Sequence, residues 1–207
     1  MRIAIPLYDR MTALDAIGPY DVLSRLPGAS VTFVGEHTGT IRTDTGFLGL
    51  TVDATFDEVP EPDIIVVPGG PAPVPVEGAL VEWLRAADRT TTWTTSVCTG
   101  SLILAAAGLL TGRRATSNWQ ARAQLAGYGV EVVEERVVFD GKYVTGAGVT
   151  AGLDLALTLA GRIAGDRVAQ AIQLGLEYDP RPPYDTGSPE RAPADVVDLV
   201  LATRAAP

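Results

Sequence analysis

Residues 91–101 read TTWTTSVCTGS, a β-rich run up to Val97 that passes directly into Cys98 and then into a helical pattern over Ser101–Leu110. A second run, residues 63–71, reads DIIVVPGGP and places four consecutive β-branched residues before a proline and two glycines. Continuous β-branched runs are typical of strands buried on both faces, as in a parallel sheet. The two stretches therefore predict two central strands, each of which ends in a tight turn.

Strands and helices alternate along the rest of the chain. Further strands are expected at Arg2–Tyr8, Val31–Val34, Arg114–Thr116, Val130–Val133, Arg136–Phe139 and Tyr143–Thr145, with a hairpin or edge strands within Thr40–Val52. Further helices are expected at Asp15–Leu26, Leu80–Ala87, Ala151–Ala164, Val168–Leu176 and, after a Pro-rich loop over Asp179–Pro193, at Ala194–Arg204. This alternation predicts a single α/β domain over residues 1–207, with a mostly parallel sheet sandwiched between helices. Ligands of such sheets collect at the carboxyl ends of the strands, where the turns at 68–71 and 97–100 lie.

Composition narrows the function classes. The chain has 207 residues, a net charge of -9, one Cys and one His. An acidic surface repels phosphate backbones, so nucleic acid is not an expected partner. One thiol makes no internal disulfide, which favours the cytoplasm, and the Cys and His content rules out a Cys/His-rich zinc site. The sequence has no apolar run of about 18 residues, no G-x-G-x-x-G after the first strand and no P-loop, so we expect no membrane span and no cofactor.

Cys98 is the centre of the predicted chemistry. A residue at a strand-to-helix turn is held on a sharp bend, and we expect its side chain to be exposed there. The positive end of the following helix favours the thiolate, which is the reactive form of cysteine. A lone cysteine is also commonly a small buried apolar residue, and position alone leaves both interpretations open.

The glycines that end the other central strand are candidates for stabilising negative charge. Backbone N–H groups of Gly69 and Gly70 are free of side-chain cover, and the N–H of Gly70 together with that of Thr99 is expected to form an oxyanion hole beside Cys98. An ordinary tight turn explains the two glycines equally well.

Asp15 and His37 are the candidate proton carriers. Asp15 lies in an apolar stretch, where a carboxyl group has a raised pKa and exchanges protons near neutrality, but the sequence alone favours a helix N-cap. His37, the only histidine, lies between Glu36 and Thr38 and is expected in a surface loop away from Cys98.

Gly69 and five further residues are candidates for a substrate pocket. Asn118 and Trp119 follow a short strand, and Gly148 precedes the helix at Ala151–Ala164. Tyr178 and Asp185 lie in or next to the Pro-rich loop, as lid elements or as surface turns. Turns and core packing are the alternative explanations for all five.

These segments together resemble the DJ-1/PfpI superfamily over essentially the whole chain. The resemblance rests on Leu14–Pro19, Val67–Gly70, Ser96–Ser101, Thr116–Trp119 and Thr145–Leu153. In that superfamily an acid on the first helix hydrogen-bonds the nucleophilic cysteine, and the Leu-Asp-x-x-Gly-Pro context of Asp15 looks like the isonitrile (isocyanide) hydratase branch. The same segment resembles the sensor domains of AraC-type regulators, whose helix-turn-helix domain is not expected in this chain.

The resemblance implies an enzyme with Cys98, Asp15 and Thr99 as catalytic residues. The implied reaction hydrates an isonitrile to an N-substituted formamide through a thioimidate, without a cofactor, in a homodimer. Asn118 departs from the family pattern, because many relatives have His there, and this puts a Cys–His mechanism in doubt. A redox or small-molecule sensor and a glyoxalase-like enzyme are the alternatives.

Overall fold

One seven-stranded sheet forms the centre of the protein. The computed structural model describes residues 1–204, with side chains up to Ala202. The strand order is β10-β11-β7-β6-β1-β2-β5. The strands are β1 (Arg2–Pro6), β2 (Ser30–Gly35), β5 (Ala54–Thr55), β6 (Ile64–Val67), β7 (Trp93–Val97), β10 (Val137–Asp140) and β11 (Tyr143–Gly146). All neighbouring pairs are parallel except β10 and β11, which form a hairpin. The mostly parallel sheet expected from the sequence is confirmed.

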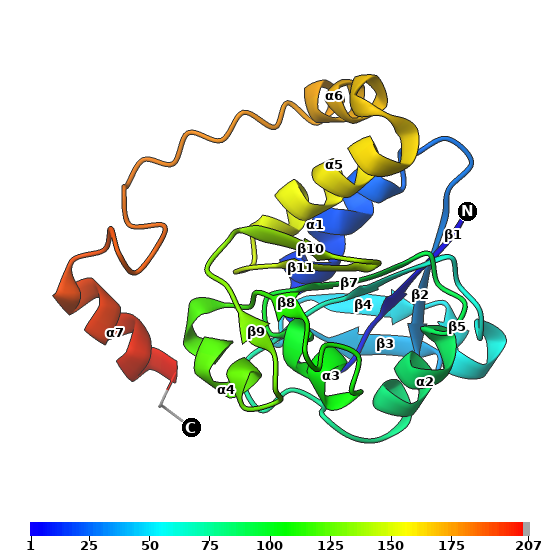
Figure 1. Ribbon diagram of the computed structural model, residues 1–207, viewed down its shortest axis with the longest axis horizontal. Helices are drawn as coiled ribbons and strands as arrows, with labels where there is room; N and C mark the ends of the chain where they lie inside the picture. The colour runs from blue at the N-terminus through cyan, green and yellow to red at the C-terminus, as the bar shows by residue number, and fades with distance from the viewer. Residues whose placement is uncertain (205–207) are drawn as a thin grey trace.

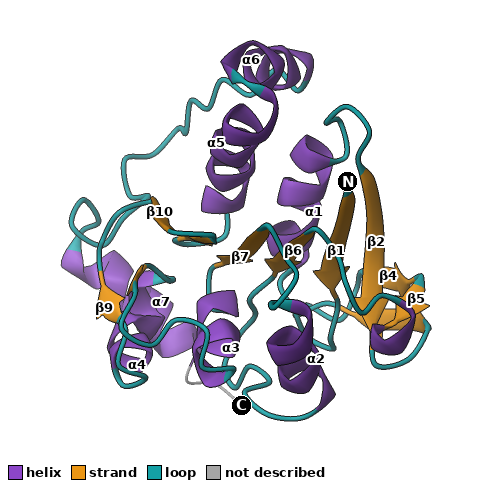
Figure 2. Ribbon diagram, turned by 45° about the vertical axis from the view of Figure 1, so that its right-hand side comes forward, coloured by secondary structure: helices purple, strands orange, loops and turns teal. Residues whose placement is uncertain are grey.

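Helices cover both faces of this sheet (Figures 1 and 2). One face carries α1 (Ala13–Leu23), α5 (Ala151–Ala164) and α6 (Asp166–Gly175), and the other carries α2 (Ala79–Ala87), α3 (Gly100–Ala106) and α4 (Arg122–Ala126). Each face has its own apolar core, and the residues of β6 are shared between them because they alternate in direction. Complete burial of all four residues of β6 explains why its sequence is uniformly β-branched.

Smaller elements surround the sheet. The strands β3 (Gly39–Arg42) and β4 (Gly49–Val52) form the predicted hairpin, and β8 (Arg114–Ala115) pairs with β9 (Glu131–Val132). Two 3-10 helices, η1 (Phe56–Glu58) and η2 (Trp119–Ala121), lie in loops, and a long loop leads to α7 (Ala194–Arg204) beside α4 (Figure 1). Within residues 1–204, no helix is both long and apolar enough to cross a bilayer.

Two details differ from the expectations. Pro19 was expected in or near the first turn of its helix but lies inside α1, where it cannot donate to the Asp15 carbonyl; its ring packs closely on α5, since a Cβ at Gly152 would lie 3.2 Å from it. The helix expected to reach Leu110 ends at Ala106, because Gly108 takes a left-handed conformation with φ of 80°.

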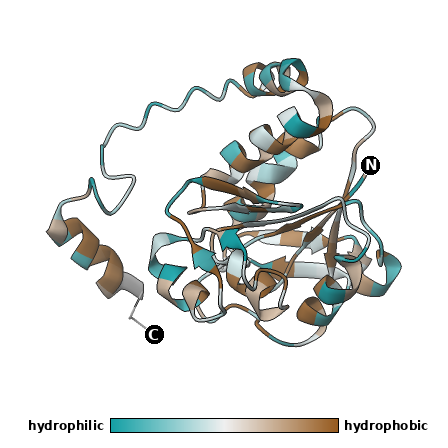
Figure 3. Cartoon of the chain, in the orientation of Figure 1, coloured by the Kyte–Doolittle hydropathy of each residue, from teal (hydrophilic) through white to brown (hydrophobic). Residues whose placement is uncertain are grey.

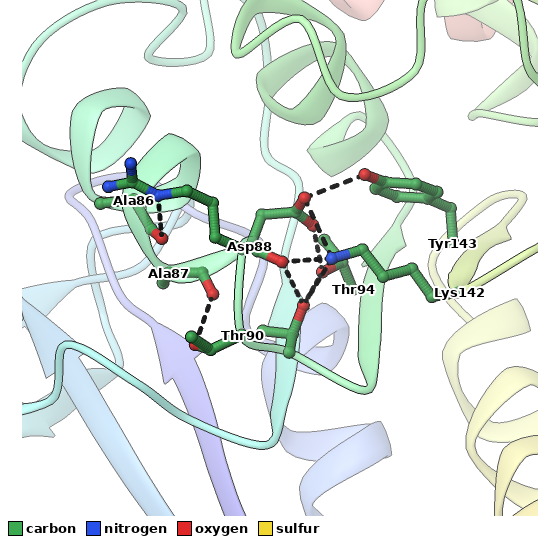
Figure 4. A network of polar contacts seen from close by, with 9 residues as sticks. Ala86, Ala87, Asp88, Thr90, Thr94, Lys142 and Tyr143 are labelled. Atoms are coloured by element: carbon green, nitrogen blue, oxygen red, sulfur yellow. Dashed lines mark hydrogen bonds and ion pairs between the residues drawn. The ribbon is translucent and has the colours of Figure 1, made fainter.

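A buried polar network joins α2 to the sheet at the end remote from the Cys98 turn (Figure 4). The Asp88 carboxylate accepts hydrogen bonds from Thr94 Oγ1 at 2.7 Å and from Tyr143 Oη at 2.9 Å, and Lys142 Nζ lies 3.1 Å from it. Burial raises the pKa of Tyr143 to about 12, and the hydrogen bond to Asp88 adds to this effect. The carboxylate is therefore fully partnered, as a buried charge must be.

Candidate active site

Cys98 lies on a sharp bend between β7 and α3, residues 97–100, which we call the elbow. Its φ of 58° is in the left-handed region, which non-glycine residues rarely adopt. The Cys98 N–H donates to the carbonyls of Ala147 at 2.8 Å and Gly146 at 3.1 Å, at the end of β11. The expected bend is present, but the expectation of an exposed side chain is wrong. Cys98 is only 2% exposed, because its side chain packs into the core between the sheet, α1 and α5.

Two glycines allow the ends of β6 and β7 to approach each other closely. A Cβ at Gly69 would lie 2.5 Å from both the backbone nitrogen and Oγ1 of Thr99. A Cβ at Gly100 would lie 2.3 Å from the carbonyl oxygen of Val67. Any side chain at either position would displace backbone, so the contact between the two turns requires glycine.

Thr99 locks the two turns together through its hydroxyl. Thr99 Oγ1 accepts from the Gly70 N–H at 2.8 Å and lies 2.7 Å from the Gly70 carbonyl oxygen, to which it donates. The Gly70 N–H was expected to face the reacting oxygen, but in this structure it is engaged by Thr99. Of the two N–H groups expected to form the oxyanion hole, that of Thr99 is therefore the remaining candidate. Its nitrogen lies close to Gly69, since a Cβ there would be 2.5 Å from it.

Asp15 lies next to Cys98 and is completely buried. It is not the N-cap of α1, as the sequence alone favoured, because Thr12 occupies that position and Asp15 is in the first turn. Its Oδ2 accepts a 2.9 Å hydrogen bond from the Gly69 N–H. Burial raises the pKa of Asp15 from 3.8 to about 7, against the opposing effects of the hydrogen bonds with Gly69 and with the Cys98 side chain. Asp15 can therefore gain or lose a proton near neutral pH.

Two buried serines hold the Cys98 carbonyl. Ser101 Oγ donates to it at 3.1 Å and Ser117 Oγ at 3.0 Å, and both residues are fully buried. The carbonyl of Cys98 and the N–H of Thr99 belong to one planar trans peptide and point in opposite directions. Holding the carbonyl on one side therefore directs the Thr99 N–H to the opposite side.

Tyr8 and Asp44 also belong to this region, and the sequence arguments missed them. Tyr8 Oη donates to the Pro68 carbonyl at 3.1 Å; burial raises the pKa of its phenol, and the charges of Asp15 and Cys98 add to this effect. Asp44 accepts from Thr12 Oγ1 at 2.8 Å, and its charge contributes to raising the Asp15 pKa. The position of Tyr8 at the end of the strand expected at Arg2–Tyr8 was a usable signal, since that end of the sheet carries the site. Ser117 lies beside the predicted Asn118, but a serine before a turn carries no such signal.

Three of the predicted pocket residues come together. Asn118, Trp119 and Gly148 line a cavity of about 430 Å³. Asn118 also caps η2, since its Oδ1 accepts from the Gln120 N–H at 3.0 Å. Gly148 faces it, because a Cβ there would lie 3.5 Å from Asn118 Nδ2. Ala147, whose carbonyl binds the Cys98 N–H, lies on the same wall.

Tyr178, Asp185 and His37 lie farther out. Tyr178 Oη donates to the Asp154 carboxylate at 3.2 Å. Asp154 also forms an ion pair with Arg136, and Arg136 lines the cavity of Asn118, Trp119 and Gly148. Asp185 is exposed and forms an ion pair with Arg191, another residue of the same cavity wall. His37 is exposed, as expected. No group of three or more His, Cys, Asp or Glu residues in the described part of the chain is placed to hold a metal ion.

The fold and the site together define the class of protein. It is an α/β protein with a mostly parallel sheet, in which a cysteine on a strand-to-helix bend is paired with a buried acid at the carboxyl end of the sheet. The sequence model of the DJ-1/PfpI family matches residues 1–162, and the chain belongs to that family. It is 44% identical to an isonitrile hydratase of Pseudomonas putida, over 100% of this chain and 91% of the relative.

Two further comparisons mark the range of its relatives. A crystal structure of a ThiJ/PfpI family protein from Pseudomonas syringae matches with a TM-score of 0.94 and 38% identity, over 99% of this chain and 86% of that one. The HTH-type transcriptional regulator CdhR of Pseudomonas aeruginosa is 31% identical over 82% of this chain, which spans 52% of the regulator.

Proposed function

We propose that this protein is an isonitrile hydratase, an enzyme that adds water to an isonitrile to give an N-substituted formamide. The substrate class follows from the 44% identity to the Pseudomonas putida enzyme, which extends over the whole chain. The chemistry is supported by one observation above all, the contact between the Cys98 side chain and a buried Asp15 whose pKa is about 7. That pair supplies a nucleophile and a proton carrier without a cofactor.

In the first step the Cys98 sulfur bonds to the terminal carbon of the isonitrile. The thiol proton passes to Asp15, and Asp15 delivers it to the same carbon. The product is a thioimidate, in which the carbon carries one hydrogen, the sulfur and the doubly bonded nitrogen. A carboxyl group with a pKa near 7 suits both halves of this transfer, because it is neither fully protonated nor fully ionised at neutral pH.

In the second step water adds to the thioimidate carbon. Asp15 takes one proton from the water, and the substrate nitrogen receives one. The carbon–sulfur bond then breaks, the remaining proton of the added water passes from the hydroxyl group to the Cys98 sulfur, and the formamide leaves. The Thr99 N–H is the proposed donor to the oxygen as charge develops on it, in place of the Gly70 N–H.

The pocket residues are proposed in two roles. One wall of the pocket, near the elbow, is formed by Asn118, Trp119 and Gly148. Arg191 lines the same cavity and links it to the loop that carries Asp185 through their ion pair. Tyr178 fixes Asp154 and Arg136 behind that wall. Gly69 permits the approach of Thr99 and holds Asp15 in place.

The test is formamide production from a simple alkyl isonitrile, followed by proton NMR. Wild-type protein is expected to turn over repeatedly, and Cys98→Ser to be inactive. Absence of turnover with alkyl and aryl isonitriles alike, by folded wild-type protein, would overturn the proposal.

We further propose that residues 1–207 form one domain that acts in the cytoplasm as a homodimer. Four exposed apolar side chains support the dimer: Leu14 and Tyr20 on α1, and Phe47 and Leu48 in the hairpin loop. The hairpin loop lies beside the start of α1, since the Asp44 N–H donates to the Met11 carbonyl at 3.0 Å. Phe47 is 91% exposed, the largest exposed fraction among the large apolar side chains described up to Ala202. Light scattering is expected to give twice the chain mass, and Phe47→Glu to give the monomer.

A further inference from the structure

A second cavity, of about 300 Å³, opens beside the elbow on the face of the sheet that carries α3. Its volume is at the lower end of the range for small-molecule pockets. Apolar side chains dominate the walls, among them Pro73, Val74, Leu102, Ala121 and Leu201. Thr99 also lines it, so the cavity reaches the residue that directly follows Cys98, although Cys98 itself packs on the α1 and α5 face and is not part of the lining.

The linear shape of an isonitrile indicates which part of the substrate such a cavity would hold. The carbon that Cys98 attacks is at one end of a linear C–N unit, and the hydrocarbon substituent continues from the nitrogen at the other end. Once the carbon lies at the elbow, the substituent must extend into neighbouring space. Apolar walls next to Thr99 stabilise a hydrocarbon group there by removing its surface from water.

One wall of this cavity comes from the C-terminal helix. Figures 1 and 2 place α7 beside α4, and Figure 3 shows α7 as mostly hydrophobic. Leu201 on α7 is 47% exposed and forms part of the rim, whereas Leu199 on the same helix is 63% exposed and does not line the cavity. The DJ-1/PfpI family match ends at residue 162, but the similarity to the isonitrile hydratase continues through α7.

We propose that this cavity binds the hydrocarbon substituent of the isonitrile and that Leu201 limits the size of the substituent. The inference rests on the proposed function and adds to it the substrate class: isonitriles with a compact apolar group. It also gives the C-terminal helix a role in specificity, which the family core alone does not supply.

The experiment compares two substrates with three variants. Leu201→Trp narrows the cavity, and kcat/KM for cyclohexyl isonitrile is expected to fall at least about tenfold, while kcat/KM for methyl isonitrile stays within about twofold. Leu201→Ala is expected to shift the ratio of the two kcat/KM values in the opposite direction, toward the larger substrate. Leu199→Trp makes the same change on the same helix outside the cavity, and is expected to leave both values unchanged.

Circular dichroism confirms that each variant is folded before the kinetics are compared. Equal effects of Leu201→Trp on the two substrates, or equal effects of Leu201→Trp and Leu199→Trp, would overturn the size-limiting role. Failure of wild-type protein to hydrate either substrate would instead overturn the proposed function itself.

Discussion

Asp15 Oδ2 accepts a 2.9 Å hydrogen bond from the backbone N–H of Gly69, a residue 54 positions away in the sequence. The contact ties α1 to the end of β6, and the Thr12 N–H reinforces it by donating to the Gly69 carbonyl at 2.9 Å. A single glycine thus orients the acid that faces Cys98. A carboxyl oxygen can accept this hydrogen bond whether the group is ionised or protonated, so the bond is compatible with a proton carrier.

Asp15→Asn is expected to lower kcat by about 10²- to 10⁴-fold, because it removes the proton carrier while keeping the shape of the side chain. Steady-state kinetics with an alkyl isonitrile measure this, and circular dichroism checks that the fold is kept. Unchanged kcat in the variant would show that Asp15 carries no proton in the reaction.

The same substitution is expected to stabilise the fold at neutral pH. The pKa of Asp15 is about 7 in the folded protein and near its ordinary value of 3.8 in the unfolded chain. As pH rises from about 4 to about 7 the unfolded chain loses this proton first, so the wild-type free energy of unfolding falls through that window. At about 1.36 kcal/mol for each unit of pKa difference, the loss is at most about 4 kcal/mol.

Urea unfolding of wild-type protein and Asp15→Asn at pH 4, 5.5 and 8 measures this difference. The free energy of unfolding of the variant, relative to that of the wild-type protein, is expected to rise with pH and to become constant above about pH 7. A constant difference at the three pH values would contradict the raised pKa.

Ser117→Ala is expected to lower kcat several-fold and to leave KM within about twofold, because Ser117 positions the Cys98 carbonyl and not the substrate. Ser96→Ala is the matched control. Ser96 is equally buried, lies on β7, and its hydroxyl has no hydrogen-bond partner among the side chains described up to Ala202. If both variants lose the same kcat, the contact with the Cys98 carbonyl has no special role.

Asp88→Ala is expected to lower the free energy of unfolding by about 1–3 kcal/mol, since it leaves Thr94 and Tyr143 without their buried acceptor. The network lies at the opposite end of the sheet from the elbow, so kcat is expected to stay near the wild-type value at 25 °C. Urea unfolding and kinetics on the same preparation check both parts. A large loss of kcat in folded protein would show that the two ends of the sheet are coupled.

The sheet and the elbow were predictable because their signals are local. Four consecutive β-branched residues before Pro68 are typical of a central strand, and the two glycines that follow β6 and β7 mark the close approach of their turns. The boundaries of α5 at Ala151 and Ala164 were also predicted, since the helical spacing is regular and Gly165 ends it.

The rest depended on contacts between distant segments. Nothing local to Cys98 indicates that α1 and α5 cover its side chain, so its burial was missed. The hydroxyl of Thr99 turned out to occupy the Gly70 N–H, because the two turns approach more closely than spacing along the chain can show. Asp15 looked like a helix cap, because the apolar residues around it do not show that Gly69 supplies its partner.

The central claim is that the Cys98 sulfur forms a covalent bond with the isonitrile carbon. Acid quenching within the first turnover, followed by peptide mass spectrometry, tests it most directly together with the rate of Cys98→Ala. We expect the peptide that contains Cys98 to gain the full mass of the isonitrile, and Cys98→Ala to form neither the adduct nor the formamide. Formamide production by folded Cys98→Ala at the wild-type rate would contradict the account.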